Sequence, residues 1–254
     1  MSRSVSPIVV IPARLGATRL PDKPLADIHG LPMIAHVWRR AMDAAVGPVA
    51  VACGEEAIAE AVRRAGGAAV LTRPGHASGS DRICEAVEAL DPGGRHDAVV
   101  NLQGDLPTVA PEVIRAVLAP LAESAVDIAT VAAPLGDPAE RDNPNVVKAA
   151  VAFAGGRRTA RALYFSRAPV PWDGGDAAAP LYHHIGIYAF RREALRRFVA
   201  LPPTPLEQRE RLEQLRALEA GMRIDVALVD TIPLGVDTPA DLARARALLA
   251  PAPR

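Results

Sequence analysis

The sequence predicts an α/β fold, with a mostly parallel central sheet, helices on both faces and an added mixed α+β lobe. Short apolar runs alternate with segments of helical spacing through the first half of the chain. Half of the residues are apolar but only 4% are aromatic. This composition suits helices that pack on a parallel sheet. A chain of 254 residues can form one large domain or a domain with a lobe.

The first half of the chain is predicted to alternate strands with helices. Strands are expected at Pro7–Ile11, Pro48–Cys53, Ala68–Leu71, Ala98–Leu102 and Asp127–Ala133, and helices at Pro32–Ala45, Glu55–Ala65, Ser80–Leu90 and Pro111–Leu121. The second of these helices has an acidic first turn and ends at Gly66, a residue that favours helix C-termini. Repeated βα units of this length imply parallel strands.

The second half is less regular. Strands are expected at Val146–Phe153, His184–Phe190 and Ile224–Leu228, and helices at Leu206–Ala220 and Pro239–Leu249. Thr238 and Pro239 favour the start of the last helix. The Gly- and Ala-rich stretch Asp173–Pro180 predicts a mobile loop. We therefore predict one domain over residues 1–254, with a core of 1–133 and 224–254 and a lobe of about 134–223.

Composition excludes several classes of function. The 29 basic and 29 acidic residues balance, whereas a general nucleic-acid surface needs a basic excess. Cys53 and Cys84 form no C-x-x-C pair, which argues against a zinc site, and two isolated thiols are expected to be reduced. We find neither a signal-peptide pattern nor an apolar run of about 20 residues, so a soluble cytoplasmic protein is expected.

A basic loop follows the first predicted strand. Arg14, Arg19 and Lys23 lie where open α/β sheets bind anionic ligands, and Gly16 allows close approach of the backbone. Arginine offers a planar fork for phosphate oxygens, and lysine a compact charge. The loop lacks the P-loop pattern. It is interpreted as a cradle for a nucleoside triphosphate, with a solvated surface turn as the alternative.

Two aspartates follow apolar segments. Asp105 comes after Ala98–Leu102, and Asp237 closes another apolar segment. A carboxylate beside bound phosphates is suited to Mg²⁺, which prefers one or two carboxylates together with phosphate oxygens and water. The alternatives are a turn at Asp105 and stabilisation of a helix start at Asp237.

Two polar groups of residues are further binding candidates. Residues Thr72–Arg82, with Ser78, Gly79 and Arg82, suit a base or ribose, although a serine there also suits a helix cap and His76 alone suits a surface position. A hydroxylated, carboxylated ligand would suit the donors and acceptors Tyr164, Ser166, Arg167, His183, His184, Tyr188, Glu213 and Gln214. The alternatives are a core histidine at His184 and a solvated helix face at Glu213.

In order along almost the whole chain, these segments resemble the 3-deoxy-manno-octulosonate (KDO) cytidylyltransferases. The similar segments are Val10–Arg14, Thr18–Leu25, Gly30–Ile34, Ser78–Arg82, Asn101–Asp105, Asn143–Lys148, Ala162–Arg167, Pro171-Trp172, His184–Tyr188, Pro205–Glu207, Leu212–Arg216 and Gly235–Pro239. Other sugar nucleotidyltransferases share the opening loop, whereas Tyr164–Arg167, His184–Tyr188 and Leu212–Arg216 are more specific.

The resemblance implies a Rossmann-like nucleotidyltransferase fold, a homodimer and Mg²⁺-dependent transfer of CMP from CTP to KDO. The products would be pyrophosphate and CMP-KDO for lipopolysaccharide synthesis in Gram-negative bacteria. It implies catalytic roles for Arg14, Lys23, Asp105 and Asp237, the last two as Mg²⁺ ligands. CTP would contact Ala13, Arg14, Leu15, Lys23, Cys53, Ser78, Gly79, Arg82, Gln103 and Asp105. The sugar would contact Arg19, Gln103, Tyr164, Arg167, His184, Tyr188, Glu213 and Gln214.

The chain departs from the family pattern at two places. Leu106 stands where many members have an acidic residue, and Cys53-Gly54-Glu55-Glu56 replaces a Thr-Asp-x-Glu-like stretch. The alternatives within the enzyme class are 8-amino-KDO or a nonulosonic acid as the sugar, or a different nucleotide. A nucleotide-binding regulatory protein without turnover is the alternative from another class, and the retained charged residues argue against it.

Overall fold

The computed structural model describes residues 5–16, 18–172 and 180–251, and these form two compact units. The first unit comprises the described residues of Ser6–Arg115 and Pro233–Arg254, and the second comprises those of Met1–Val5 and Ala116–Ile232. Residues 116–133 and 224–232, which the sequence analysis assigned to the core, thus group with residues 134–223. The description as one domain with a lobe stays a prediction.

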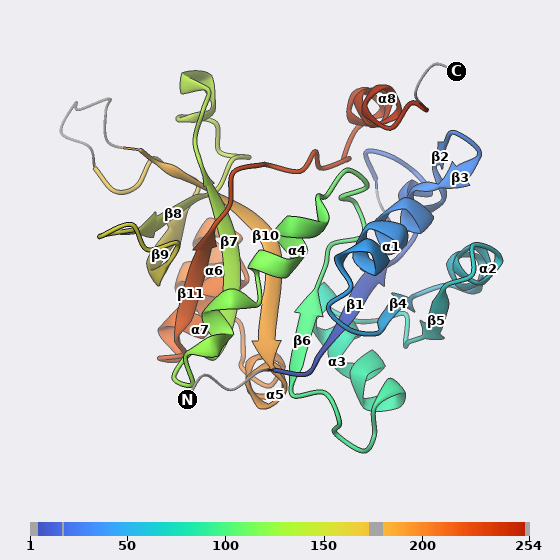
Figure 1. Ribbon diagram of the computed structural model, residues 1–254, viewed down its shortest axis with the longest axis horizontal. Coiled ribbons are helices and arrows are strands. Elements are labelled where there is room, and N and C mark those ends of the chain that lie inside the picture. Colours follow the sequence, from blue (N-terminus) through green and yellow to red (C-terminus); the bar gives the residue numbers. More distant parts are fainter. Residues whose placement is uncertain (1–4, 17, 173–179, 252–254) are drawn as a thin grey trace. The chain divides into compact units, whose positions relative to one another are not determined.

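The first unit contains a parallel sheet of four strands. They are β1 (Pro7–Ala13), β4 (Val49–Cys53), β5 (Ala68–Leu71) and β6 (Ala98–Asn101), in the order β5-β4-β1-β6 (Figure 1). Each neighbouring pair is parallel, as predicted. The chain runs outward from β1 to β5 and then returns to β6 on the other side of β1. The strand order therefore reverses between β1 and β6, where open α/β sheets bind ligands.

Three helices connect these strands: α1 (Met33–Ala44), α2 (Glu56–Arg64) and α3 (Gly79–Leu90). Right-handed crossovers place α1 and α2 on one face, and the return connection places α3 on the other. The capping box of Ser78 and Asp81 starts α3, which confirms a predicted cap. Helix α4 (Pro111–Ala116) follows β6, and the predicted helix over Pro111–Leu121 is interrupted before the short helix η2 (Ala119–Ala122).

The C-terminal segment of the first unit returns to its N-terminal part. Helix α8 (Pro239–Leu248), capped by Thr238 as predicted, packs beside the hairpin of β2 (Asp27–Ile28) and β3 (Leu31–Pro32). Ile28, Met33, Val236, Leu242 and Ala245 form the apolar cluster between them. This packing fixes the segment that carries Asp237, and η1 (Lys23–Leu25) precedes the same hairpin.

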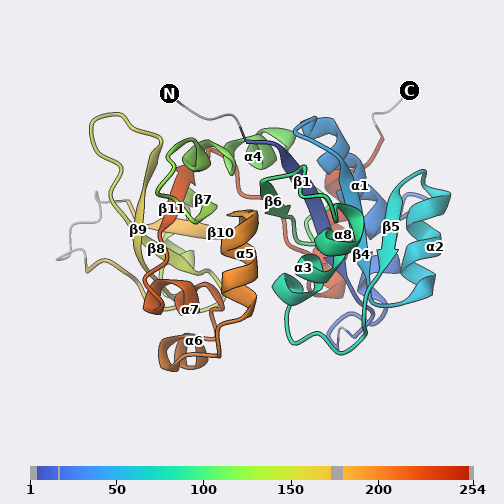
Figure 2. The same ribbon diagram turned by 90° about the horizontal axis from the view of Figure 1, so that it is seen from below.

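The second unit is a mixed sheet. Its strands are β7 (Ile128–Pro134), β8 (Lys148–Val151), β9 (Thr159–Ser166), β10 (Tyr182–Arg191) and β11 (Ile224–Leu228). Only β7 and β11 pair in parallel among the described pairings of this unit, and β8 pairs with both β9 and β10. The pairings therefore close into a ring. Helices α5 (Arg192–Val199) and α7 (Gln214–Glu219) lie beside β10 and β9 (Figure 2).

Three expectations for the second unit were wrong. Strand β9 lies in the stretch predicted to be irregular, and α5 was not predicted. The predicted helix Leu206–Ala220 is divided into α6 (Pro205–Glu210) and α7, because Arg211 adopts a left-handed conformation with φ of 54°. Arg167 donates to the carbonyl oxygens of Glu210 and Arg211, which stabilises this break.

The loop predicted at Asp173–Pro180 lies outside the described residues, apart from Pro180. The short 3₁₀ helix η3 (Pro138–Glu140) completes the elements of the second unit in the described ranges. A search of the described helices found none with the length and apolar character needed to cross a membrane.

Candidate functional site

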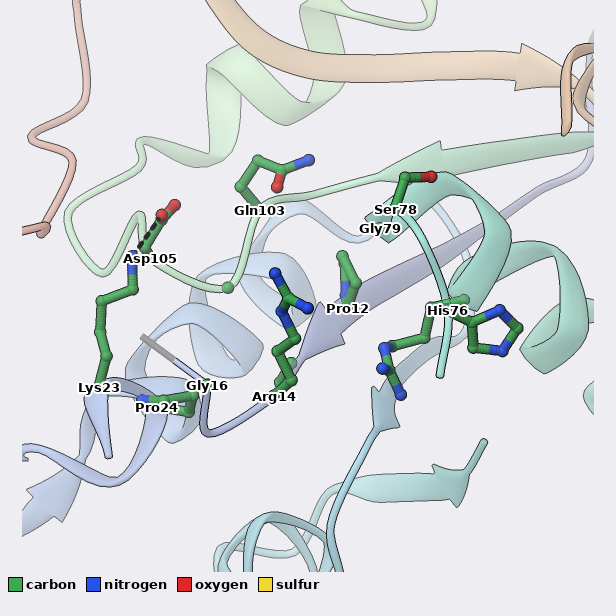
Figure 3. A pocket seen from close by; sticks show the side chains of 13 residues that line it. Pro12, Arg14, Gly16, Lys23, Pro24, His76, Ser78, Gly79, Gln103 and Asp105 are labelled. Atoms are coloured by element: carbon green, nitrogen blue, oxygen red, sulfur yellow. Dashed lines mark hydrogen bonds and ion pairs between the residues drawn. The ribbon is translucent and has the colours of Figure 1, made fainter. Parts of the chain in front are cut away.

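A cavity of about 330 Å³ lies in the first unit, at the carboxyl ends of β1 and β6 (Figure 3). Its lining comes from three segments: Pro12, Ala13, Arg14, Gly16, Lys23 and Pro24 after β1; His76, Ser78, Gly79 and Arg82 at the start of α3; and Gln103, Gly104 and Asp105 after β6. The structure thus brings the predicted basic loop, the serine segment and the first aspartate to one cavity.

Close backbone packing shapes the floor of this cavity. A Cβ on Gly104 would lie 2.8 Å from the carbonyl oxygen of Pro12, and one on Gly79 would lie 3.4 Å from Cγ of Pro12. The first distance is shorter than a real Cβ contact allows. Glycine at position 104 therefore lets the chain after β6 approach the end of β1, and it sets the position of the neighbouring Asp105.

Lys23 joins the two predicted metal ligands. Its Nζ donates to Oδ2 of Asp105 and to Oδ1 of Asp237, both at 2.9 Å, and Figure 3 shows Lys23 and Asp105 pointing toward each other. Nη2 of Arg19 lies 3.1 Å from Oδ2 of Asp237. Burial alone would lower the pKa of Lys23, but Asp105 and Asp237 raise it above its usual value. The two carboxylates therefore converge on one ammonium group.

Two arginines add positive charge to the cavity. Arg14 is exposed at the end of β1, whereas Arg82 is 2% exposed. Arg82 donates to Oγ1 of Thr72 and to the carbonyl oxygens of Arg73 and Pro74, which are all neutral acceptors. Gly54 lies against both arginines, since a Cβ there would be 3.1 Å from Nη1 of Arg82 and 3.4 Å from Cβ of Arg14. The arrangement suits an anionic ligand.

His76 is a lining residue that the sequence analysis did not select as a ligand. Its side chain is 7% exposed, and its Nε2 lies 2.7 Å from Oε2 of Glu85. Arg73 donates to Glu85 and, with His76, lowers the pKa of that carboxyl to about 2. An ionised carboxylate only accepts hydrogen bonds, so Nε2 carries a proton. His76 lies on a loop and Glu85 lies in α3, nine positions further along the chain. No pattern in the sequence predicts a contact between them.

Ser78 and Gln103 have partners within the first unit. The hydroxyl of Ser78 donates to Oδ2 of Asp81 and accepts from its backbone N–H, as a helix cap does. Nε2 of Gln103 donates to Oδ1 of Asn101 at 3.1 Å. Ser78 is therefore both the helix cap and a binding candidate. Ser78 and Gln103 both line the cavity.

Two predicted CTP contacts do not line this cavity in the described part of the chain. Cys53 is fully buried in β4, and its thiol lies 3.5 Å from the carbonyl oxygen of Val51. Burial raises the pKa of this thiol to about 12, so it is protonated at neutral pH. The backbone N–H of Leu15 donates to Oε2 of Glu55 at 3.1 Å. The thiol of Cys53 and the backbone N–H of Leu15 therefore both have partners within the fold.

The second unit contains a buried aromatic and polar cluster around His184. Its Nε2 lies 3.0 Å from Oγ1 of Thr130, and its ring packs against Phe165 and Tyr188, with centroids 4.7 and 5.5 Å away. Burial lowers the pKa of His184 to about 3 and raises the pKa of Tyr188. Both side chains are therefore neutral at neutral pH, and His184 fits the core-histidine alternative.

The remaining predicted sugar ligands of this unit differ in their partners. Arg167 donates to the carbonyl oxygens of Pro144, Glu210 and Arg211, so it also has a structural role. Burial, followed by the charge of Glu210, raises the pKa of Tyr164. Gln214 is buried, and its Nε2 has no hydrogen-bond partner within the described residues. Glu213 precedes it at the start of α7. A buried amide without a protein partner can donate to an ordered water or to a ligand oxygen.

Known proteins are similar to this chain over almost its full length. A family model described as cytidylyltransferase matches residues 8–224. A 3-deoxy-manno-octulosonate cytidylyltransferase of Rhodospirillum centenum is 67% identical over 246 residues, which is 97% of this chain and 94% of the relative. The enzyme of that name in Paramagnetospirillum magneticum is 65% identical over 245 residues, or 96% of this chain and 98% of the relative.

Solved structures are also similar. A structure of CMP:2-keto-3-deoxy-manno-octonic acid synthetase complexed with CTP matches with a TM-score of 0.88 and 41% identity, covering 96% of this chain and 98% of the other. A nucleotidyl transferase from Methanothermobacter matches with a TM-score of 0.60 and 17% identity, covering 95% and 96%. The second match shows similarity of fold alone.

Proposed function

We propose that this chain, which belongs to the 3-deoxy-manno-octulosonate cytidylyltransferase family, transfers CMP from CTP to KDO and releases pyrophosphate. The observation that carries this proposal is the convergence of Asp105 and Asp237 on Lys23, in a first unit whose cavity is also lined by Arg14 and Arg82. The CTP-complexed relative supports the nucleotide, and the names of the relatives support the sugar.

The residues present fit a divalent cation. Asp105 and Asp237 each place one oxygen 2.9 Å from the same nitrogen, so both oxygens face one position that a cation could take. Among the described residues no group of three or more His, Cys, Asp or Glu side chains suits a metal. Two carboxylates, completed by phosphate oxygens and water, are the set that Mg²⁺ prefers. Bound there, Mg²⁺ would act as a Lewis acid toward the phosphates and the attacking hydroxyl.

The cationic side chains of the first unit would offset the negative charge of the two substrates. CTP and KDO are both anions, and two unit charges about 4 Å apart repel by about 4 kcal/mol at an effective dielectric constant of roughly 20. Arg14, Lys23 and Arg82 would offset the triphosphate charge and the charge that develops on pyrophosphate. The 2-hydroxyl of the sugar would then attack the α-phosphorus in line, and fixed positioning of the reactants would supply much of the rate.

The sugar ligands remain part of the proposal. His184 and Tyr188 would offer neutral hydrogen-bonding groups, and the unpaired Nε2 of Gln214 would donate to a sugar oxygen. Arg19, Gln103, Tyr164, Arg167 and Glu213 complete the proposed set, by resemblance to the family. Arg14, Lys23, Ser78, Gly79, Arg82, Gln103 and Asp105 line the proposed nucleotide cavity. Ala13 is the remaining lining residue among the proposed CTP contacts.

The proposal also includes several finer properties that the resemblance implies. We include in the proposal a Rossmann-like core, which the parallel order β5-β4-β1-β6 supports. A homodimer, a cytoplasmic location and use of the product in lipopolysaccharide synthesis are also included.

Pyrophosphate release from CTP, with and without KDO and at varied Mg²⁺, tests the proposed function. We expect release only when all three are present. Release with 8-amino-KDO or a nonulosonic acid, but not with KDO, would replace the sugar in the proposal. CTP binding without any product over a long incubation would instead support a regulatory protein.

A further inference from the structure

Lys23 lies within a charge cluster that is neutral as it stands. Its ammonium contacts Asp105 and Asp237 at 2.9 Å, and Arg19 contacts the second oxygen of Asp237 at 3.1 Å. Two cations therefore match two carboxylates. A neutral cluster has little long-range attraction for a further cation, even though it contains the two carboxylates that suit one.

The contacts also place Nζ at the point where the two carboxylates meet. An ion held jointly by Asp105 and Asp237 would take the oxygens that now accept from Nζ, Oδ2 of the first and Oδ1 of the second. An ammonium and a divalent cation cannot occupy one position, and they repel each other at short distance. One must leave when the other binds.

We propose that Lys23 is a positioning residue that holds Asp105 and Asp237 together in the nucleotide-free protein and exchanges with a divalent cation when CTP binds. This inference rests on the proposed function. The ammonium takes the place of the cation before the nucleotide arrives, and it keeps two like charges close without a metal.

The chain allows this exchange without a change of fold. The side chain of Lys23 is 17% exposed, and it begins in the short helix η1 next to the cavity. Its flexible four-carbon stem lets Nζ turn away while the backbone stays in place. A triphosphate brings negative oxygens for the released ammonium and ligands for the metal. The cation and the nucleotide therefore bind in a linked way, and each strengthens the other.

Binding of Mn²⁺ alone to the nucleotide-free protein tests the exchange, by titration calorimetry or by electron paramagnetic resonance of free Mn²⁺. Lys23→Met removes the competing ammonium, and we expect Mn²⁺ to bind about tenfold more tightly than to the wild type. Asp237→Asn added to Lys23→Met should remove the gain. Lys23→Gln is a second variant that keeps a polar side chain, and it should give the same direction.

Arg64→Met is the matched control. Arg64 is 73% exposed in the first unit and lies 3.7 Å from Glu60, so this change removes one positive charge away from the cavity. Its Mn²⁺ affinity should equal that of the wild type. If folded Lys23→Met and Lys23→Gln bind Mn²⁺ no more tightly than the wild type, the exchange is wrong. The proposed function is then still judged separately, by pyrophosphate release from the wild type.

Discussion

The two groups of candidate residues differ in charge and in burial. In the first unit, Lys23, Asp105 and Asp237 form salt bridges across short distances and are partly exposed. In the second unit, His184 is buried and Tyr188 is half-buried, and desolvation keeps both neutral. Desolvation disfavours the charged form of an isolated buried group, whereas a partner of opposite charge restores it.

The charged residues and the neutral residues therefore support the proposed function in different ways. Paired charges around a cavity indicate the class of ligand directly, since they suit phosphates and a cation. In the second unit, His184 lies beside Thr130 within hydrogen-bond distance, and the unpaired amide of Gln214 is the feature that would suit a ligand oxygen. The first group therefore carries the proposed function, and the second depends on resemblance to the family.

Apart from the loss of Asp105 or Asp237, the largest effect that we expect comes from Lys23→Ala. In the proposed mechanism, the ammonium of Lys23 offsets the negative charge that develops on pyrophosphate. Without it, kcat should fall by about 10²- to 10³-fold. Steady-state kinetics with CTP and KDO measure this change. An increase in KM for CTP at unchanged kcat would instead limit Lys23 to ground-state binding.

Gly104→Ala tests the backbone packing of the charged region. The added Cβ would lie 2.8 Å from the carbonyl oxygen of Pro12. We expect a loss of about 3 kcal/mol in the free energy of unfolding, together with lower activity. Gly93→Ala is the matched control, because a Cβ there meets no described atom within 4 Å. Equal stability of the two variants in urea unfolding would argue against this packing.

The neutral region makes a prediction about pH. The folded pKa of His184 is about 3, below its ordinary value of 6.5. The unfolded chain therefore binds more protons between these values, and stability falls as pH decreases through this window. From pH 6.5 to 5.0, His184 should account for about 2 kcal/mol of the loss. Urea unfolding of His184→Gln should show a correspondingly smaller decrease, and an unchanged slope would mean that His184 is charged in the fold.

Glu85→Gln should have the smallest effect of the series. Glu85 holds His76 at the cavity wall, but its carboxylate is 29% exposed, so solvent screens the interaction. We expect KM for CTP to rise about fivefold, equal to about 1 kcal/mol, while kcat stays constant. Glu112→Gln provides a comparison, since its salt bridge with Arg115 lies at 2.6 Å but outside the cavity lining. The same rise in both variants would remove the proposed role of Glu85.

Much of the first unit could be predicted from the sequence, because its signals are local. Apolar runs and caps identified β1, β4, β5, β6, α1, α2 and α3, and the connections of a parallel sheet placed the ends of β1 and β6 together. The meeting of Asp237 with Lys23 could not be predicted from spacing, since 214 residues separate them. It follows from the packing of α8 on the β2–β3 hairpin.

The second unit was harder because its structure depends on distant contacts. Strand β9 carries both exposed and buried residues without a clear period, and the break at Arg211 depends on donors from Arg167. Burial also changed two interpretations. Cys53 belongs to a fully buried strand, and His76 is held by Glu85 instead of lying on the surface.

Asp105 and Asp237 are proposed to hold Mg²⁺ beside the triphosphate. Mg²⁺-dependent pyrophosphate release by Asp105→Asn and Asp237→Asn, with folding checked by circular dichroism, tests it most directly. We predict that each folded variant loses about 10³-fold or more of the activity. Near-normal release by both variants would contradict the claim.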